Sequence, residues 1–193
     1  MRFHKLTVCS FALSVVFGSL VLAQTSQPKH DPDVPYVPTT EEAVKAMLKL
    51  ADVKSTDIVY DLGCGDGRIV IAAAKEYGAH GVGIDINPER IQEAKENAKK
   101  AGVENLVRFE ERDLFDADIH EATVVTLFLL NSVNLKLRPK LLKDLKPGTR
   151  IVSNTFHMDD WKPDKEQTVG DPVEGFSLSH KLFLWIVPQR NQK

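Results

Sequence analysis

The stretch Asp61-Leu62-Gly63-Cys64-Gly65-Asp66-Gly67 decides the fold, because it connects an apolar run to a helical pattern. The preceding run, Ile58-Val59-Tyr60, is typical of a buried strand, and residues 68–77 continue as a helix. Glycine has no side chain, so three glycines in one turn permit positive φ and a close approach of the backbone to a ligand. The helix that follows offers unpaired N–H groups and the positive end of its dipole. The stretch therefore predicts a cofactor cradle.

The spacing of the glycines separates two classes of cofactor. The dinucleotide fingerprint G-x-G-x-x-G needs a third glycine where the helix meets the strand. Here that position holds Arg68, and Gly67 comes one residue earlier. An acid, Asp61, also precedes the first glycine by two residues. The pattern D-x-G-x-G-x-G resembles the first motif of the doubly wound S-adenosylmethionine-dependent methyltransferases. The turn alone leaves two alternatives open, a nicotinamide cofactor and a tight turn that binds no ligand.

Three acids are expected at the edge where a doubly wound sheet binds its ligand, beyond the carboxyl ends of the strands. Asp61 ends the first strand, Asp85 ends a strand over 81–86, and Asp113 follows one over 106–109. The methyltransferase resemblance implies that Asp61 contacts the methionine portion of the cofactor, often through water. It also implies that Asp85 accepts both ribose hydroxyls and that Asp113 takes the adenine amino group. Six further residues belong to the same implied cofactor site: Gly63, Cys64, Gly65, Gly67, Ile86 and Leu114.

Strand and helix patterns alternate along the rest of the chain, which predicts an α/β fold. A first helix is expected after Thr39, which has capping-box spacing to Glu42, and its apolar stripe should pack on the sheet or over the cofactor cleft. Asn87 is expected to cap the helix over 89–101. Further strands are predicted over 123–130, 150–155, 165–169 and 177–187, with a helix over 135–145 that Pro139 kinks or delays. The last two strands should be antiparallel, because their loop is too short for a crossover helix. We expect a doubly wound, mostly parallel seven-stranded sheet with a C-terminal antiparallel hairpin, as in class I methyltransferases.

The N-terminus is typical of a secretory signal peptide over residues 1–23. Arg2 and Lys5 precede an apolar stretch over 6–22, and small residues occupy the usual cleavage positions before a cut after Ala23. An uncleaved membrane anchor is the alternative, because 6–22 reaches the lower limit of about 17 residues for a span. In either case we expect the remainder of the chain to be exported, either to the periplasm or out of the cell. Prolines mark 24–38 as a linker, so the domain is predicted over 39–188. Export leaves open how a cofactor made in the cytoplasm would be supplied.

The composition of the chain argues against nucleic-acid binding, a disulfide framework and a zinc site. The 193 residues suffice for one domain with a sizeable core, and the formal net charge of −2 gives no basic field to attract nucleic acid. The two cysteines, Cys9 and Cys64, allow no disulfide framework, and the sequence contains no zinc-type cluster. We therefore expect no metal and no nucleic-acid partner, and membrane contact only through an uncleaved 6–22.

A wider set of motifs narrows the resemblance. The motifs are PYVPT at 35–39, VYDLG at 59–63, DGRIV at 66–70, ATVVTL at 122–127 and PGTR at 147–150. Together they are similar to the small lysine methyltransferases that modify the c subunit of mitochondrial ATP synthase and the adenine nucleotide translocase, with their bacterial relatives. More distantly they resemble the Dot1-like histone lysine methyltransferases. The similarity covers about 34–187 and implies methyl transfer from S-adenosylmethionine to protein lysine. A small-molecule acceptor, and a protein that binds the cofactor without turnover, remain alternatives because function belongs to the site.

The acceptor side of the site is less defined by the sequence. The loop after the fourth strand, 129–134, lacks the Asn/Asp-Pro-Pro-Tyr tetrapeptide of enzymes that methylate amide or exocyclic nitrogens, so those acceptors are not expected. Tyr36 is a candidate wall over the methyl group, with core packing as its alternative. Asn131 is a candidate for orienting an amine, with a structural role in the turn as its alternative, and His157 lies on the expected substrate rim after the fifth strand. No residue is identified as the base.

Overall fold

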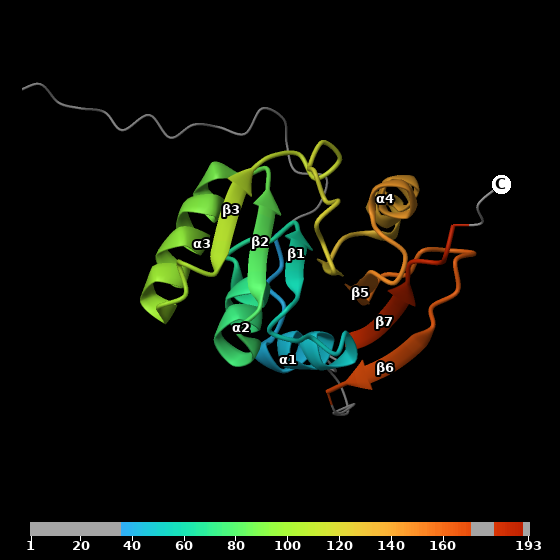
Figure 1. Ribbon diagram of the computed structural model, residues 1–193, viewed down its shortest axis with the longest axis horizontal. Coiled ribbons are helices and arrows are strands. Elements are labelled where there is room, and N and C mark those ends of the chain that lie inside the picture. The colour runs from blue at the N-terminus through green and yellow to red at the C-terminus, as the bar shows by residue number, and fades with distance from the viewer. Residues whose placement is uncertain (1–35, 171–179, 191–193) are drawn as a thin grey trace, which may run out of the picture.

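The computed structural model describes residues 36–170 and 180–190, so the predicted signal peptide or anchor and nearly all of the linker lie outside the described residues (Figure 1). The elements are α1 (Glu41–Leu50), β1 (Ile58–Leu62), α2 (Arg68–Tyr77), β2 (His80–Asp85), α3 (Pro88–Ala101), β3 (Val107–Glu111), β4 (Val124–Leu127), α4 (Asn131–Asp144), β5 (Arg150–Asn154), β6 (Lys165–Val169) and β7 (His180–Ile186). Among the described residues, every helix falls short of the length and apolarity that a membrane span requires.

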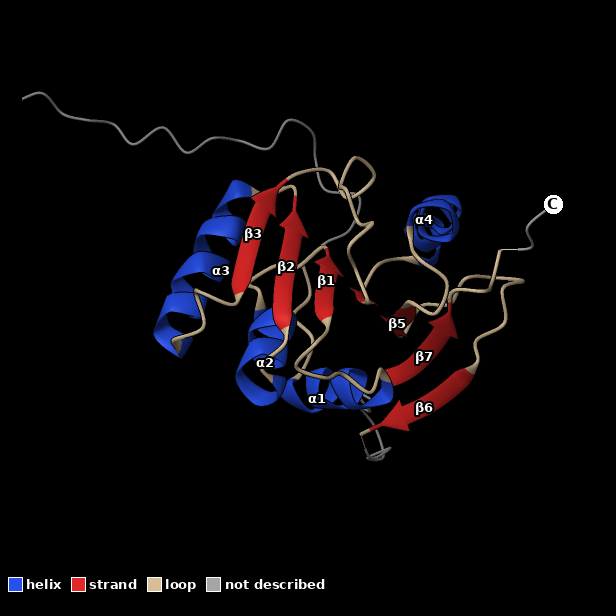
Figure 2. Cartoon of the chain, viewed as in Figure 1, coloured by secondary structure: helices blue, strands red, loops and turns tan. Residues whose placement is uncertain are grey.

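The seven strands form one sheet in the order β3-β2-β1-β4-β5-β7-β6. Figure 2 shows β3, β2 and β1 side by side at one end and β7 beside β6 at the other. Strands β1 to β5 pair in parallel, whereas β7 is antiparallel to both β5 and β6. The predicted fold is therefore confirmed, including the terminal hairpin. The strand order reverses between β1 and β4, and ligands of doubly wound sheets bind at the carboxyl ends of the strands at such a switch.

The two faces of the sheet are covered by different elements. Side chains alternate along each strand, so Val59 packs on one face and Tyr60 on the other. The Val59 face is covered by α1 and α2, and the α1 stripe of Val44, Met47 and Leu48 is buried there. The Tyr60 face is covered by α4 and by loops, and Figure 1 shows α4 lying apart from the other three helices. The first helix therefore packs on the sheet, one of the two positions that its sequence allowed.

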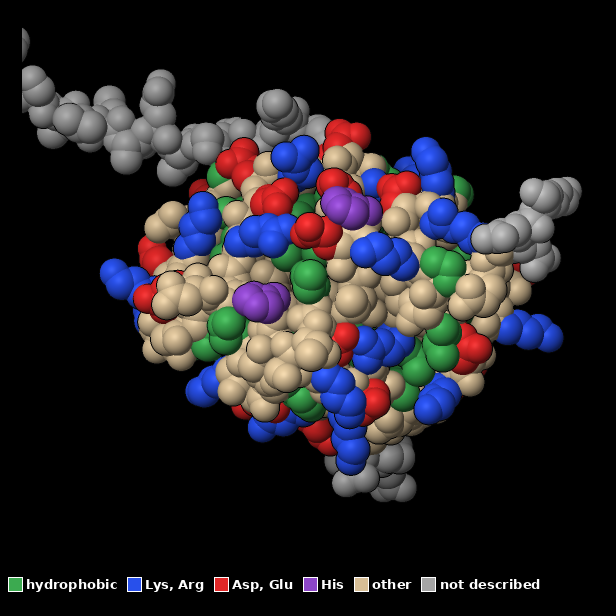
Figure 3. Space-filling model, viewed as in Figure 1, with side chains coloured by type: hydrophobic (Ala, Val, Ile, Leu, Met, Phe, Trp, Pro, Cys, Tyr) green, Lys and Arg blue, Asp and Glu red, His purple; other side chains and the backbone are tan. Residues whose placement is uncertain are grey.

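Acidic and basic side chains are interspersed on the face seen in Figure 3, without a large area of one sign. That distribution agrees with the small net charge of the chain.

The end of β4 differs from the prediction. The strand stops at Leu127, and the apolar residues that follow leave the sheet; Leu130 is the N-cap of α4, which begins at Asn131. Apolar Leu129 and Leu130 continue the strand pattern, but they pack beside a cavity instead of a neighbouring strand. Helix α4 begins at Asn131, before the predicted start at residue 135, and Pro139 lies within it. Pro139 therefore does not delay the start of the helix.

The caps of two other helices can be compared with the predictions. Thr40, not Thr39, is the N-cap of α1, and its Oγ1 accepts a hydrogen bond from Ala43 N at 3.2 Å. The predicted cap was therefore one residue early, and Thr39 is buried. Asn87 caps α3 as predicted, accepting from Glu89 N at 2.8 Å.

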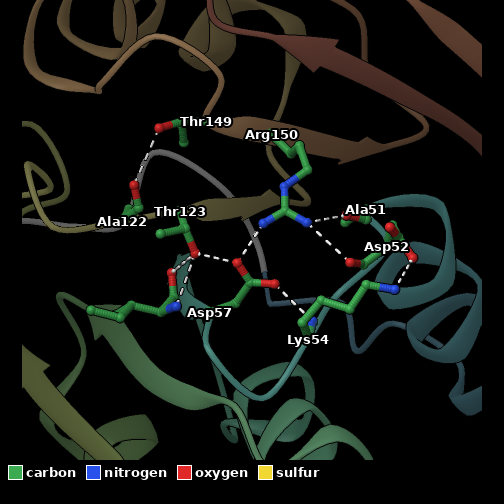
Figure 4. A network of polar contacts seen from close by, with 9 residues as sticks. Ala51, Asp52, Lys54, Asp57, Ala122, Thr123, Thr149 and Arg150 are labelled. Carbon is green, nitrogen blue, oxygen red and sulfur yellow. Dashed lines mark hydrogen bonds and ion pairs between the residues drawn. The ribbon is translucent and has the colours of Figure 1, made fainter.

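A polar network joins the amino ends of three strands around Asp57 (Figure 4). Asp57 is buried, and its Oδ1 accepts hydrogen bonds from Thr123 Oγ1 at 2.7 Å and from the Arg150 guanidinium. Its Oδ2 accepts from Lys54 N at 2.7 Å. The same guanidinium donates to the carbonyl of Ala51 at 2.7 Å. The strand ends opposite the ligand-binding edge are therefore held by paired charges and satisfied hydrogen bonds.

Candidate active site

The glycine turn leaves β1 and is fastened to β2. Gly63, Gly65 and Gly67 all have positive φ, at 85°, 52° and 79°. The N–H groups of Gly63 and Cys64 both donate to the carbonyl of Ile84, at 2.8 and 2.9 Å. The turn therefore curls over the end of β2 before α2 begins at Arg68.

The glycines of the turn are required for different reasons. A Cβ at Gly65 would lie 2.4 Å from the ring of Tyr36, so the ring lies directly on the turn. A Cβ at Gly67 would instead lie 2.7 Å from Phe109 and 2.9 Å from Ala94. Gly67 is thus buried between α3 and β3 and does not line the cavity described next. In the structure Gly67 permits close packing of helix and strand, and its predicted contact with the cofactor stays a prediction.

A cavity of about 290 Å³ opens along the carboxyl edge of the sheet, from the end of β3 to the end of β5. Eight of the nine predicted cofactor residues line it: Asp61, Gly63, Cys64, Gly65, Asp85, Ile86, Asp113 and Leu114. The volume is near the lower end of the range for small-molecule sites. The structure thus brings together residues from three separate strand ends, which span the sequence from Asp61 to Leu114.

Three carboxyl groups follow one another along this cavity. Asp61 is buried, accepts from Thr126 Oγ1 at 2.7 Å and has no ion-pair partner among the described residues. Burial raises the pKa of Asp61 to about 7, with the Thr126 hydrogen bond acting in the opposite direction. Asp85 accepts from Gly65 N at 2.8 Å, and Asp113 accepts from Phe115 N at 2.9 Å. They lie at the ends of β1, β2 and β3 in turn, and the methionine, ribose and adenine contacts implied for them stay predictions.

The segment before α1 forms one wall of the cavity. The ring of Tyr36 lies under the guanidinium of Arg90, whose carbon is 4.8 Å from the ring centroid. Arg68 donates to the carbonyl of Thr39 at 2.7 Å and pairs with Asp66 at 2.6 Å. Arg68 therefore fastens this segment to the glycine turn. Tyr36 remains 48% exposed, so it closes the side of the cavity and is not a core residue.

The far end of the cavity, beyond β4 and β5, is mostly apolar. Its lining residues there are Phe128, Leu129, Leu130, Val133, Thr155 and Phe156, which we call the acceptor end. The rings of Phe128 and Phe156 are 6.1 Å apart between centroids. Buried Asn134 and Ser153 both donate to the carbonyl of Phe156, at 3.3 and 2.6 Å, which holds this wall in place.

Two of the predicted acceptor-side residues lie outside the cavity lining. Asn131 and His157 contact each other, because Asn131 Oδ1 accepts from His157 N at 3.1 Å. His157 Nδ1 accepts from Asp159 N at 3.0 Å. This pair ties the start of α4 to the loop after β5, and the structure does not bring either side chain to the cavity wall.

The sequence did not identify four of the residues that form the walls: Arg90, Phe128, Thr155 and Phe156. Phe128 and Thr155 share one signal, since each is the first residue after a parallel strand. Arg90 has no local signal, because it reaches Tyr36 across the fold from the first turn of α3.

The cavity suits S-adenosylmethionine by its own geometry. Its turn of positive-φ glycines admits a ligand against the backbone, and its acids can accept from the hydroxyl and amino groups of a nucleoside. No cation in the described part of the chain pairs with the buried Asp61 carboxyl, and a positively charged ligand would supply one. No group of metal-binding residues occurs among the residues described here.

Comparison with known proteins gives consistent matches. Residues 61–165 match the family model described as the ANTKMT methyltransferase domain. The chain is 50% identical over 157 residues to a protein-lysine N-methyltransferase of Saccharolobus islandicus (strain REY15A), which covers 81% of this chain and 95% of that protein. It is 37% identical over 131 residues to the Xenopus laevis lysine N-methyltransferase of the ATP synthase c subunit, and this match covers 68% of this chain. The chain spans only 57% of the length of that second relative.

A solved structure is similar over most of its length. It is described as an RNA methyltransferase from Salinibacter ruber in complex with S-adenosyl-L-homocysteine. The sequence identity is 52%, the TM-score is 0.73, and the match covers 81% of this chain and 97% of that one. S-Adenosylhomocysteine is what remains of S-adenosylmethionine after methyl transfer, so that structure contains the demethylated form of this cofactor. Its description names a different acceptor from those of the two sequence relatives.

Proposed function

The chain belongs to the ANTKMT methyltransferase family and uses S-adenosylmethionine, and from that premise we propose that it methylates the side-chain amine of lysine in a protein. The observation that carries the proposal is the apolar acceptor end of the cavity. An amine must be neutral to act as a nucleophile, and apolar surroundings lower the pKa of lysine. The names of both sequence relatives, as lysine methyltransferases, support the same acceptor.

We assign the cofactor to the eight lining residues named above, with three roles for the acids. Asp61 faces the methionine portion, Asp85 the ribose and Asp113 the adenine. Each oxygen of Asp85 accepts one backbone N–H, from Gly65 or Asn87, and keeps a second lone pair for a hydroxyl. Asp85 therefore links the ribose position to the conformation of the glycine turn.

When bound, S-adenosylmethionine would supply a methyl carbon to the lone pair of an amine that has already lost its ammonium proton to solvent. As the carbon–sulfur bond breaks, its electron pair would stay on sulfur and the positive charge would pass to the nitrogen. The chain contributes positioning, which holds the reacting atoms in line. Tyr36 and the phenylalanines of the acceptor end exclude water and confine the side chain of the lysine. No acidic or basic side chain lies among the six residues of the acceptor end, so the proposed mechanism assigns no protein base there.

RNA is the second candidate acceptor, because the Salinibacter ruber structure is described as an RNA methyltransferase. The small negative net charge and the interspersed surface charges in Figure 3 argue against a nucleic-acid footprint. A small-molecule acceptor is a third candidate, and cofactor binding without turnover is a fourth.

Radiolabelled S-adenosylmethionine tests the acceptor when the purified protein is incubated with envelope and cytoplasmic extracts. We expect a label that protease removes and ribonuclease does not, at a methylated lysine located by mass spectrometry. A label sensitive to ribonuclease would instead identify RNA, and a label in the low-mass fraction would identify a small molecule. Cofactor binding by calorimetry without any transferred label would favour a binding protein. Asp85→Ala protein is the matched control for labelling that does not require the site.

We also propose that residues 1–23 export the chain, supported by the charged and apolar pattern of the sequence. The expected product is a chain that begins at Gln24 in the periplasm or medium, as read by N-terminal sequencing. An intact chain in the membrane fraction would indicate the anchor over 6–22, and an intact chain in the cytoplasm would contradict export.

A further inference from the structure

Thr155 has a strained backbone at the acceptor end of the cavity. Its φ of 66° is rare for a β-branched residue, and Phe156 N donates to the carbonyl of Asn154 at 2.8 Å. A bond between residues two apart, around a central residue with positive φ, is the rarer and strained form of the γ-turn. Thr155 N donates to Lys181 O at 2.7 Å, so β7 holds this conformation. Such strain is concentrated at functional sites, which makes the residue a candidate for a role beyond packing.

The side chain of Thr155 is oriented by two neighbours. Its hydroxyl donates to Asn154 Oδ1 at 3.0 Å, and Asn154 is fully buried at the end of β5. His180 Nδ1 lies 3.0 Å from the same oxygen, and His180 Nε2 lies 3.4 Å from Thr40 Oγ1. Neutral His180 can satisfy both contacts by donating from Nδ1 and accepting at Nε2. With this tautomer, two donors converge on the Asn154 carbonyl oxygen, and the proton of the Thr155 hydroxyl points toward it.

This orientation restricts the hydrogen bonds that the Thr155 hydroxyl can form with a group in the cavity. A hydroxyl has one proton and two lone pairs. Because the proton points at Asn154, the oxygen can only accept a hydrogen bond from a group in the cavity. The other five residues of the acceptor end are apolar, so this oxygen is the single side-chain hydrogen-bonding group there among the described residues.

An amine is the acceptor group that this arrangement fits. A neutral amine has N–H donors and one lone pair, and a hydrogen bond from one N–H fixes the direction of the lone pair. We propose that Thr155 is a substrate-contacting residue, whose hydroxyl oxygen accepts an N–H of the lysine amine and directs its lone pair toward the methyl group. This inference rests on the function proposed above and adds a named residue to it.

Two substitutions separate the hydroxyl from the shape of the side chain. Thr155→Val keeps the β-branched shape and removes the oxygen, whereas Thr155→Ser keeps the oxygen. The probe is a synthetic peptide that contains the labelled lysine identified by mass spectrometry. We expect Thr155→Val to lower kcat for this peptide about tenfold and Thr155→Ser to stay within about threefold of the wild type. Thr168→Val, on exposed β6, is the matched control and should match the wild type.

Binding supplies a readout that does not depend on turnover. A fluorescently labelled form of the same peptide should bind Thr155→Val several-fold more weakly than it binds the wild type, with both proteins saturated with S-adenosylhomocysteine. Calorimetry should give the same affinity for S-adenosylhomocysteine in both proteins. If the valine variant does not fold, Thr155→Ala removes the same oxygen without the β-branch.

The outcomes distinguish this inference from the proposed function. Wild-type protein that transfers no methyl to any lysine would overturn both. Wild-type transfer with unchanged transfer and peptide binding in Thr155→Val would overturn the role of Thr155 alone. Equal losses in the serine and valine variants, or a parallel loss of S-adenosylhomocysteine affinity, would also overturn it, because neither can arise from the lost oxygen at the acceptor.

Discussion

Asp57 and Asp61 lie at opposite ends of β1, and both are buried, but their surroundings differ. Asp57 receives hydrogen bonds from Lys54 N, Thr123 and the Arg150 guanidinium. Asp61 receives one from Thr126, and no cation among the described residues pairs with it. At the amino end of the sheet, the buried carboxylate is therefore neutralised and hydrogen-bonded by groups of the protein itself. The carboxyl end contains a carboxyl group whose charged form is stabilised by the Thr126 hydrogen bond but by no cation among the described residues, as expected where a cationic ligand binds.

The largest expected effect is at the amino end. Asp57→Asn leaves the Arg150 guanidinium without its anion in a mostly buried position, and we expect a loss of about 3–5 kcal/mol in the free energy of unfolding. Urea titration at pH 8 measures it. Asp52→Asn, which removes the exposed partner of Lys54, is the control and should cost less than about 1 kcal/mol. Equal losses in the two variants would contradict the special status of Asp57.

The same substitution at Asp61 should have the opposite sign. Because burial raises the pKa of Asp61 from 3.8 to about 7, the unfolded chain ionises from about pH 4 while the folded chain stays protonated. This group should therefore lower the free energy of unfolding by about 2–4 kcal/mol as the pH rises from 4 to 7, with no further change above. Asp61→Asn stays neutral, so it should lose this slope and be more stable than the wild type at pH 8.

Paired urea titrations of wild type and Asp61→Asn at pH 4.5, 6 and 8 isolate this slope, since other groups contribute equally to both. A difference that does not grow with pH would contradict the raised pKa. Binding should respond in the reverse direction, because a cationic ligand favours ionised Asp61. We expect S-adenosylmethionine to bind the wild type more tightly at pH 8 than at pH 6, and Asp61→Asn to show little of this change.

A smaller effect, on binding, is expected at Asp85. Asp85→Ala removes the acceptor assigned to the ribose and the bond that fixes Gly65, so the affinity for S-adenosylhomocysteine should fall about 30-fold, or about 2 kcal/mol. Calorimetry measures this change. Glu111→Ala removes an exposed acid at the end of β3 and should leave the affinity unchanged. A similar affinity in Asp85→Ala and the wild type would refute the ribose assignment.

The smallest effect is expected at Gly67, a residue of the glycine turn that packs inside the fold and does not line the cavity. Gly67→Ala should cost about 1–2 kcal/mol of stability through its positive φ, plus the repacking of Phe109. Gly102→Ala is matched in φ, at 70°, and has open space around its Cβ position. Thermal unfolding of the two variants separates backbone strain from the clash. A loss in Gly102→Ala as large as that in Gly67→Ala would show that packing against Phe109 contributes nothing.

The cofactor side of the cavity could be predicted because its signals are local. Asp61, Gly63 and Gly65 follow one another in a single turn, and Asp85 and Asp113 each end a strand with a readable apolar pattern. The acceptor end could not be predicted in the same way. Thr155 has significance only because β7 supplies His180 and Lys181 beside it, and nothing near residue 155 in the sequence indicates that contact.

The amino-end network was missed for the same reason. Asp57, Thr123 and Arg150 are far apart in sequence, and each is an ordinary loop or strand residue by pattern. The misplaced end of β4 has another cause. Leu129 and Leu130 are as apolar as strand residues, and periodicity alone does not distinguish packing against a strand from packing beside a cavity.

The segment from Tyr36 to Thr39, which forms a wall of the cavity, is also where the chain leaves the predicted N-terminal region. Thirteen residues, 23–35, separate it from the apolar stretch 6–22 and span at most about 45 Å when fully extended. If that stretch stays in a membrane, the linker would keep the mouth of the cavity within this distance of the bilayer. Acceptors in the same bilayer would then be met at a high effective concentration, set by tether length and not by their affinity. If the stretch is cleaved, the same enzyme must search three dimensions. Processing of the N-terminus would thus decide between a surface-bound and a freely diffusing methyltransferase with identical chemistry.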